Sequence, residues 1–184
     1  WAEKKNDVSM ITLDSKSSDF LELHPRINRY ALNVMHESTS LLNAAKNNLF
    51  RIKELRSAIK ESMPDVIVSF MDVTNVLTLL ATRGLGLRVI VSERTVPSLY
   101  SIESGWSRLR KMTYPWADVV VVQTLHVARW VEDKMRCNKV VVIPNPLSIE
   151  EVNNSSVTLT EVIGDSVCAP TIIAMGRMNK EKGF

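Results

Sequence analysis

The expected fold of this chain follows from one segment, DVIVSFMDVTNVLTLLATRGLGLRVIVS, at residues 65–92. It opens with the apolar run DVIVSF at residues 65–70, continues with a helical segment at residues 74–82, and closes with a second apolar run, RVIVS, at residues 88–92. Both runs are rich in β-branched residues and do not alternate apolar with polar positions. That pattern indicates strands buried on both faces, as in a parallel sheet that helices cover on either side.

Strands and helices continue to alternate in both directions from this stretch. Further strands are expected at residues 8–13, 118–122 and 139–143, with a weaker one at 27–34, and further helices at residues 41–63, 104–114 and 124–135. Apolar positions at spacings of three and four support the first of these helices, and Pro64 ends it. The predicted fold class is therefore α/β, with a parallel sheet between layers of helices.

Composition narrows the classes of function. The 184 residues are 45% hydrophobic and 23% charged, which is typical of a soluble globular protein. A net charge of +3 is too small to predict a nucleic-acid partner. Cys137 and Cys168 have no metal-ligand or redox spacing, and neither a membrane-length apolar run nor a signal peptide occurs. We therefore expect a cytoplasmic protein with reduced thiols.

The sequence changes character after residue 144. Residues 145–170 contain many Asn, Ser, Gly and Pro residues with weak periodicity, which is typical of a linker. Residues 171–175 (TIIAM) then begin a new apolar run, which predicts the first strand of a second domain at residues 171–184. We therefore expect a first domain at residues 1–144. Because the chain starts at Trp1 and stops within the second pattern, we also expect a fragment that lacks both ends.

The segment GRMNKEKGF, residues 176–184, has residues suited to a phosphate-binding loop after a strand. Gly176 allows a tight turn at the carboxyl end of a parallel strand, where ligands bind in open α/β sheets. Arg177 can donate two hydrogen bonds to phosphate oxygens, and Lys182 supplies a second cation. A solvated, charged loop is the alternative, and the spacing alone favours it. Neither a P-loop nor the Gly-x-Gly-x-x-Gly dinucleotide pattern is present.

Five sequence blocks follow one another in a defined order. They are MPDVIVSF at residues 63–70 with Thr74 and Asn75, VSER at 91–94, YPWADVVVVQT at 114–124, VIPNP at 142–146, and the Gly-Arg to Lys-Gly-Phe segment at 176–184. In this order they resemble the family-four glycosyltransferases, most closely the bacterial members that build exopolysaccharide or lipid-linked oligosaccharides. These are retaining enzymes of the GT-B architecture, in which two Rossmann-like domains face each other across a cleft. The resemblance implies a Rossmann-like N-terminal domain here, followed by the start of a second one.

The resemblance also implies the partners and the reaction. In such enzymes the C-terminal domain binds a nucleotide sugar, which is a substrate and not a cofactor, and the N-terminal domain holds a lipid-linked or glycan acceptor. Gly176, Arg177 and Lys182 match the element that grips the donor diphosphate, where two cations neutralise the charge that develops on the leaving group. No Asp-x-Asp motif occurs, so neither a metal nor a cofactor is expected. The catalytic residues are not identified, and we expect the fragment itself to have little or no activity.

Four more residues follow strands and are expected at the cleft: Glu93, Arg94, Asn75 and Thr124. Glu93 and Arg94 could position the acceptor or touch the donor phosphate, and the alternative is an ion pair at the end of a strand. Thr124 could donate to a phosphate at a helix N-terminus, although a plain N-cap is the simpler account. A helix cap is likewise the simpler account of Asn75.

Residues 106–116 (WSRLRKMTYPW) interleave aromatic side chains with Arg108, Arg110 and Lys111. Such a helix can lie on an anionic membrane, which would suit a lipid-diphosphate acceptor and peripheral contact with the inner face of the plasma membrane. The favoured alternative is a helix that packs on the sheet with its basic face in water.

Two other functions stay open on the sequence alone. A non-catalytic Rossmann-like binding module would share this fold, because one fold hosts many functions. A GT-B relative with epimerase or phosphorylase activity would share the motifs. Product assays would separate these functions from sugar transfer.

Overall fold

The computed structural model describes residues 1–19, 22–35, 40–95, 102, 104–137 and 139–146. The chain separates into two compact units, residues 1–143 and residues 144–184. All helices and strands formed by the described residues belong to the first unit. The predicted linker and the predicted start of a second domain lie almost entirely outside the described residues, so the domain boundaries stay a prediction.

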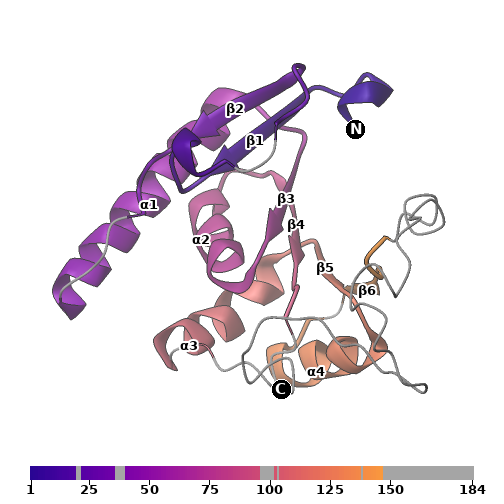
Figure 1. Cartoon of the computed structure of the whole chain (residues 1–184). Coiled ribbons are helices and arrows are strands. Elements are labelled where there is room, and N and C mark those ends of the chain that lie inside the picture. The colour runs from indigo at the N-terminus through magenta and orange to yellow at the C-terminus, as the bar shows by residue number, and fades with distance from the viewer. Residues whose placement is uncertain (20–21, 36–39, 96–101, 103, 138, 147–184) are drawn as a thin grey trace, which may run out of the picture. The chain divides into compact units, whose positions relative to one another are not determined.

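Four parallel strands form the larger of two sheets (Figure 1). They lie in the order β3 (Val66–Phe70), β4 (Arg88–Ser92), β5 (Val119–Val122) and β6 (Val140–Val142). The register places Ile67 opposite Val89, and Ile90 opposite Val119. The prediction of an α/β fold with a parallel sheet is confirmed.

Two further strands, β1 (Val8–Thr12) and β2 (Ile27–Ala31), pair with each other in a separate parallel sheet. The apolar run at residues 8–13 predicts a strand buried on both faces, and for β1 that prediction is wrong. Ser9 and Met10 are exposed, and no residue of β1 is fully buried. The physical reason is that, among the described residues of β1, Ile11 is the one that packs against a buried core, so the rest of the strand lacks such cover.

The helices follow the expected order. They are α1 (Leu41–Ser62), α2 (Asp72–Thr82), α3 (Ser104–Thr113) and α4 (Leu125–Met135), with short 3₁₀ turns η1 (Ala2–Lys4), η2 (Lys16–Ser18) and η3 (Tyr114–Trp116). The Ser40 hydroxyl caps α1 by accepting from the Asn43 amide at 3.2 Å. None of the helices that the structure describes is both long enough and apolar enough to cross a bilayer.

Helix α2 starts two residues earlier than the sequence suggests. The Asp72 carboxylate accepts from the Val73 amide at 2.7 Å, so one of the free N–H groups of the first turn has a partner. The carboxylate also lies in the first turn, where negative charge is favoured by the helix dipole. These two effects extend the helix back to Asp72.

Two apolar cores meet at α2. In the first, Val76 and Leu79 of α2 pack with the strand residues Val91 and Val120 and with the α4 residue Val131. The second core is built from α1 and α2, and its buried members are Leu55, Ile59, Leu77 and Ala81. Figure 1 shows α2 between α1 and strands β3 and β4. Helix α2 therefore joins the four-stranded sheet to the α1 layer.

Candidate functional site

Residues that follow β3, β4 and β5 lie at one edge of the sheet, because the three strands are parallel. Backbone hydrogen bonds continue past the strand ends and hold this edge together. The Met71 amide donates to the Ser92 carbonyl at 3.3 Å, and the Glu93 amide donates to the Val121 carbonyl at 2.8 Å. The carboxyl edge of a parallel sheet is where open α/β proteins bind ligands, so this edge is the candidate site.

Glu93 is buried at this edge and accepts hydrogen bonds from three side chains. One carboxylate oxygen accepts from the Tyr114 hydroxyl at 2.8 Å and from the Arg110 guanidinium at 3.3 Å. The other accepts from the Thr95 hydroxyl at 2.9 Å. The side chain is 1% exposed. These contacts fit the interpretation of Glu93 as part of an ion pair at a strand end. The other interpretation, in which Glu93 positions the acceptor or contacts the donor phosphate, stays a prediction.

Tyr114 and Asn75 extend the network from η3 to α2. Burial, together with the nearby Glu93 carboxylate, raises the pKa of the Tyr114 phenol well above its usual value. The phenol therefore stays protonated and donates a hydrogen bond to Glu93. The Asn75 amide nitrogen donates to the Ser92 carbonyl at 3.0 Å and to the Tyr114 hydroxyl at 3.2 Å. Asn75 lies inside α2, whose N-cap is Met71, so the helix-cap interpretation of Asn75 is wrong. Its side chain instead fixes the end of β4 from within the protein.

Arg110 belongs to this network and not to a basic surface. The sequence predicts it among the solvent-facing cations of α3, and that prediction is wrong because the residue is 2% exposed and paired with Glu93. Its guanidinium carbon also lies 5.3 Å from the centre of the Trp130 ring. A signal was present: Trp106, Arg110 and Tyr114 are spaced by four, which puts them on the same face of a helix.

Three buried polar atoms near this edge have no hydrogen-bond partner among the described residues: Asp72 Oδ2, Asn75 Oδ1 and Arg110 Nε. The two oxygens belong to the first turn of α2, which follows β3. A buried acceptor without a donor costs about 1–3 kcal/mol. The start of α2 is therefore a place where a hydrogen-bond donor would be stabilising.

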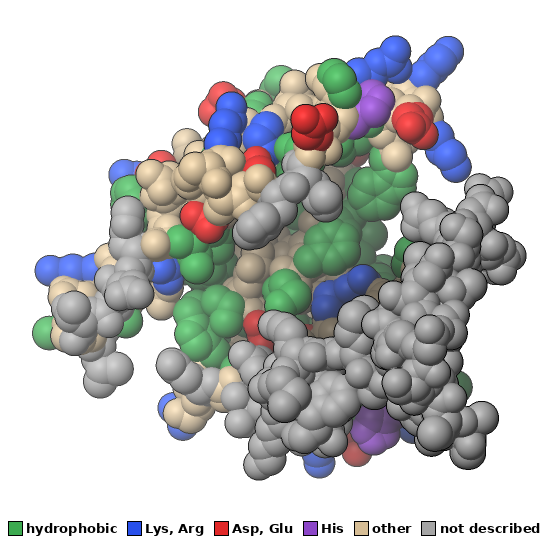
Figure 2. Space-filling view, in the orientation of Figure 1, with side chains coloured by type: hydrophobic (Ala, Val, Ile, Leu, Met, Phe, Trp, Pro, Cys, Tyr) green, Lys and Arg blue, Asp and Glu red, His purple; other side chains and the backbone are tan. Residues whose placement is uncertain are grey.

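Arg94 brings a positive charge to the same edge. Its side chain is partly exposed, and its guanidinium carbon lies 5.9 Å from the centre of the Phe70 ring at the end of β3. On the face shown in Figure 2, hydrophobic side chains gather in the middle and most Lys and Arg side chains lie around them. A cation held over an aromatic ring is well suited to meet a phosphate, and the assignment of Arg94 to the cleft stays a prediction.

Thr124 is the N-cap of α4. Its hydroxyl oxygen accepts from the Val127 amide at 3.3 Å, while the residue itself is exposed. The cap interpretation describes these contacts. The hydroxyl hydrogen is not used in this bond, so a role as a donor to a ligand stays a prediction.

We expect Thr124→Ala to lower the free energy of unfolding by about 1 kcal/mol, because the cap of α4 is lost. Thr124→Ser keeps the capping oxygen and should change stability by only a few tenths of a kcal/mol. Urea denaturation of both variants measures the difference. An equal loss in the two variants would contradict the capping account.

The remaining predicted site residues, Gly176, Arg177 and Lys182, lie outside the described residues. Within the described part of the chain, no group of three or more His, Cys, Asp and Glu residues could hold a metal ion.

Cys137 is a free, buried thiol, and burial raises its pKa to about 11.

Comparison with known proteins assigns the chain to a family. A family model described as Glycosyltransferase Family 4 matches residues 1–151. The chain belongs to glycosyltransferase family 4. The match covers both sheets and every helix that the structure describes, so the α/β fold is that of a family 4 domain of the Rossmann-like type.

One relative of this family 4 chain comes from Campylobacter jejuni subsp. jejuni serotype O:2. It is a GalNAc-alpha-(1->4)-GalNAc-alpha-(1->3)-diNAcBac-PP-undecaprenol alpha-1,4-N-acetyl-D-galactosaminyltransferase, and it is 31% identical over 119 residues. The aligned part is 65% of this chain and 32% of the relative. The chain therefore matches about a third of the length of the relative.

Proposed function

We propose that this chain is the acceptor-side domain of a retaining glycosyltransferase. The protein would transfer a sugar from a nucleotide-activated donor to a lipid-linked or polysaccharide acceptor at the inner face of the plasma membrane. The family match over residues 1–151 carries the proposal. The Campylobacter relative, whose name states transfer of N-acetylgalactosamine to an undecaprenol diphosphate glycan, supports the choice of a lipid-linked acceptor.

The geometry of the carboxyl edge supports a role in ligand binding. Arg94 offers a cation there, Thr124 offers an exposed hydroxyl at a helix N-terminus, and the first turn of α2 has two buried oxygens without a donor among the described residues. In the proposal, Arg94 and Thr124 meet negative charge from the donor or the acceptor. The buried network of Glu93, Tyr114 and Asn75 fixes the end of β4, next to Arg94.

The donor diphosphate is assigned to Gly176, Arg177 and Lys182 in the same proposal. Two cations at the diphosphate stabilise the nucleoside diphosphate as the glycosidic bond breaks, so the proposed reaction needs no metal. A unit-charge pair 4 Å apart contributes about 4 kcal/mol at an effective dielectric constant near 20. The contribution is therefore large enough to matter for the rate.

The test uses the full-length product of the gene, because the chain matches only part of its relative. The protein is incubated with a panel of nucleotide sugars, N-acetylgalactosamine derivatives included, and with lipid-diphosphate acceptors that carry short glycans. We expect one donor to be consumed and the acceptor to gain one or more sugars, with the anomeric configuration of the donor kept in the product.

Each alternative gives a different product in this assay. Conversion of the nucleotide sugar without an acceptor would indicate an epimerase, and release of a sugar phosphate in the presence of phosphate would indicate a phosphorylase. Binding of nucleotide sugars with no product from any acceptor would favour a non-catalytic binding module. Any of these three results would overturn the proposed transfer reaction.

A further inference from the structure

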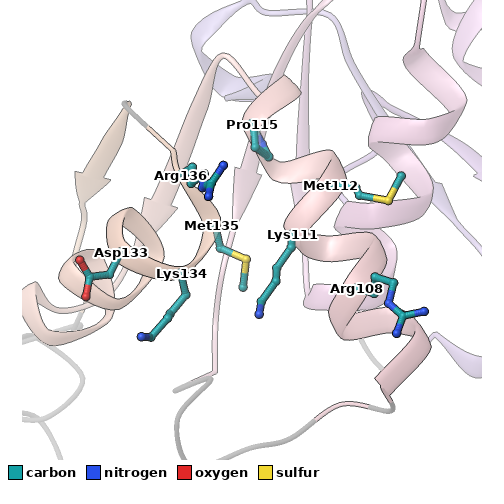
Figure 3. A pocket seen from close by; sticks show the side chains of 8 residues that line it. All are labelled: Arg108, Lys111, Met112, Pro115, Asp133, Lys134, Met135 and Arg136. Carbon is teal, nitrogen blue, oxygen red and sulfur yellow. The ribbon is translucent and has the colours of Figure 1, made fainter.

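The described part of the chain has a basic groove between the carboxyl ends of α3 and α4 (Figure 3). The groove has a volume of about 450 Å³, and Arg108, Lys111 and Met112 line it from α3. Lys134 and Met135 line it from α4, followed by Arg136. In Figure 3 the side chains of Lys111 and Lys134 point the same way, with Met135 between them. A second hollow shares Arg136 with the groove and adds Lys139.

The groove lies at the end of the sheet opposite the candidate site. Helix α4 starts at Thr124, where β5 ends, and it finishes at Met135, just before β6 begins. The end of α3 leads into β5 in the same way. A ligand bound at the carboxyl edge would therefore not contact the cations of this groove.

The cations of the groove are exposed and not neutralised. Four cations line the groove and a fifth, Lys139, lines the neighbouring hollow. All five are exposed, and none forms an ion pair with an acid in the described part of the chain: Arg108, Lys111, Lys134, Arg136 and Lys139. Two acids lie among them, Asp133 in the groove and Asp118 in the neighbouring hollow. Five cations on one surface produce a local positive field even though the net charge of the chain is only +3.

The helix ends argue against a small enclosed anion as the partner. Anions bind at helix N-termini, where free N–H groups point outward, but the groove is formed by two helix C-termini with free carbonyl groups. Cations in the last turn complement these carbonyls and extend beyond them on long side chains. At the rim, Met112 is 55% exposed. Long cations around an exposed apolar side chain fit a broad anionic surface that also accepts apolar groups.

We propose that this groove binds the surface of a membrane that contains anionic phospholipids. The proposal rests on the proposed function only for its setting, a lipid-linked acceptor. It replaces the membrane surface expected from residues 106–116 with a different set of residues. Arg110 is not part of the proposed surface, because it is paired with Glu93 inside the protein. The proposed surface consists of Arg108 and Lys111 of α3 together with three cations of the α4–β6 region: Lys134, Arg136 and Lys139.

The test measures binding of the full-length protein to vesicles by sedimentation. Vesicles of phosphatidylcholine alone are compared with vesicles that also contain phosphatidylglycerol, at low and at high salt. We expect binding to the phosphatidylglycerol vesicles, weakened by salt. The double variant Lys111→Gln/Lys134→Gln should bind them about 25-fold more weakly, because each cation near an anionic surface contributes about fivefold.

The matched control is Lys53→Gln/Lys60→Gln, which removes two exposed lysines from α1. It should bind phosphatidylglycerol vesicles as the unchanged protein does, and both double variants should keep the thermal stability of that protein. Equal binding to both kinds of vesicle, or an equal loss in the two double variants, would overturn the proposal. Complete displacement by millimolar inorganic phosphate would overturn it too, since that result indicates a site for a free anion.

Failure of this proposal and failure of the proposed function can be told apart. The vesicles carry neither a glycan acceptor nor a nucleotide sugar, so an inactive protein would still bind them. A transferase that binds no vesicles would keep the proposed reaction and refute the groove as a membrane surface.

Discussion

Replacing Arg110 with methionine is expected to lower the free energy of unfolding by about 3–5 kcal/mol, because it leaves the Glu93 carboxylate buried without its cation. The two side chains are 3% and 1% exposed, so solvent does not screen the charge that remains. The stacking of Arg110 on Trp130 is lost as well. Urea denaturation followed by tryptophan fluorescence measures the loss, since Trp130 and Trp106 lie in the helices around the pair.

A second substitution separates the charge effect from lost packing. In the Arg110→Met background, Glu93→Gln removes the uncompensated charge and keeps an oxygen that can accept from Tyr114. The double variant should therefore be more stable than Arg110→Met alone. Arg108→Met, an exposed position on the same helix, is the control and should stay within about 0.5 kcal/mol of the unchanged protein. A similarly small effect of Arg110→Met would show that the pair is solvated.

Substitution of Arg177 by alanine is expected to lower kcat of the full-length protein by about 10²–10³-fold, with lysine at this position giving an intermediate rate. Removal of one group that stabilises developing charge typically has an effect of this size. Lysine keeps the charge of arginine and loses its two-pronged hydrogen bonding. Lys182→Ala should lower kcat in the same direction. Initial rates over a range of donor concentrations measure kcat and KM for each variant.

Lys180 provides the matched control for the donor site, because it carries the same charge two residues before Lys182. Lys180→Ala should leave kcat within a fewfold of the unchanged protein. Unchanged donor use in both Arg177→Ala and Lys182→Ala would refute the diphosphate assignment. Equal losses in all three lysine and arginine variants would point to a general effect of charge on the protein.

Much of the fold could be predicted from local signals. Strand β4 has the predicted bounds, Arg88–Ser92, because a short β-branched run flanked by turn residues is a strong signal in itself. Helix α4 begins after its predicted cap, Thr124, because a threonine before a helical run is a local signal for a helix start. The division into two sheets could not be predicted in this way, because β1 and β3 both read as apolar runs. Which strands pair with each other is decided by tertiary contacts.

In the candidate site, too, the sequence predicts where a residue lies in the fold but not which distant residues it contacts. The place of Glu93 after a strand predicts that it lies at the carboxyl edge, and the structure has it there. Its partners Arg110 and Tyr114 come from a different part of the chain, 17 and 21 residues later. A charged residue within a basic segment reads as a surface cation unless its helix face is considered. The spacing of four from Trp106 to Arg110 and Tyr114 carries that information.

Helix α2 contributes side chains to both apolar cores, so the two cores of the first unit cannot open independently of each other. Val76 and Leu79 pack in the core of the four-stranded sheet, while Leu77 and Ala81 pack in the core between α1 and α2. A fluctuation that loosens α2 must therefore loosen both cores, which makes this helix part of the last region to open. Strands β1 and β2, with few buried side chains, can open on their own. Slow amide hydrogen exchange should thus be concentrated in α2 and β4, with faster exchange in β1 and β2.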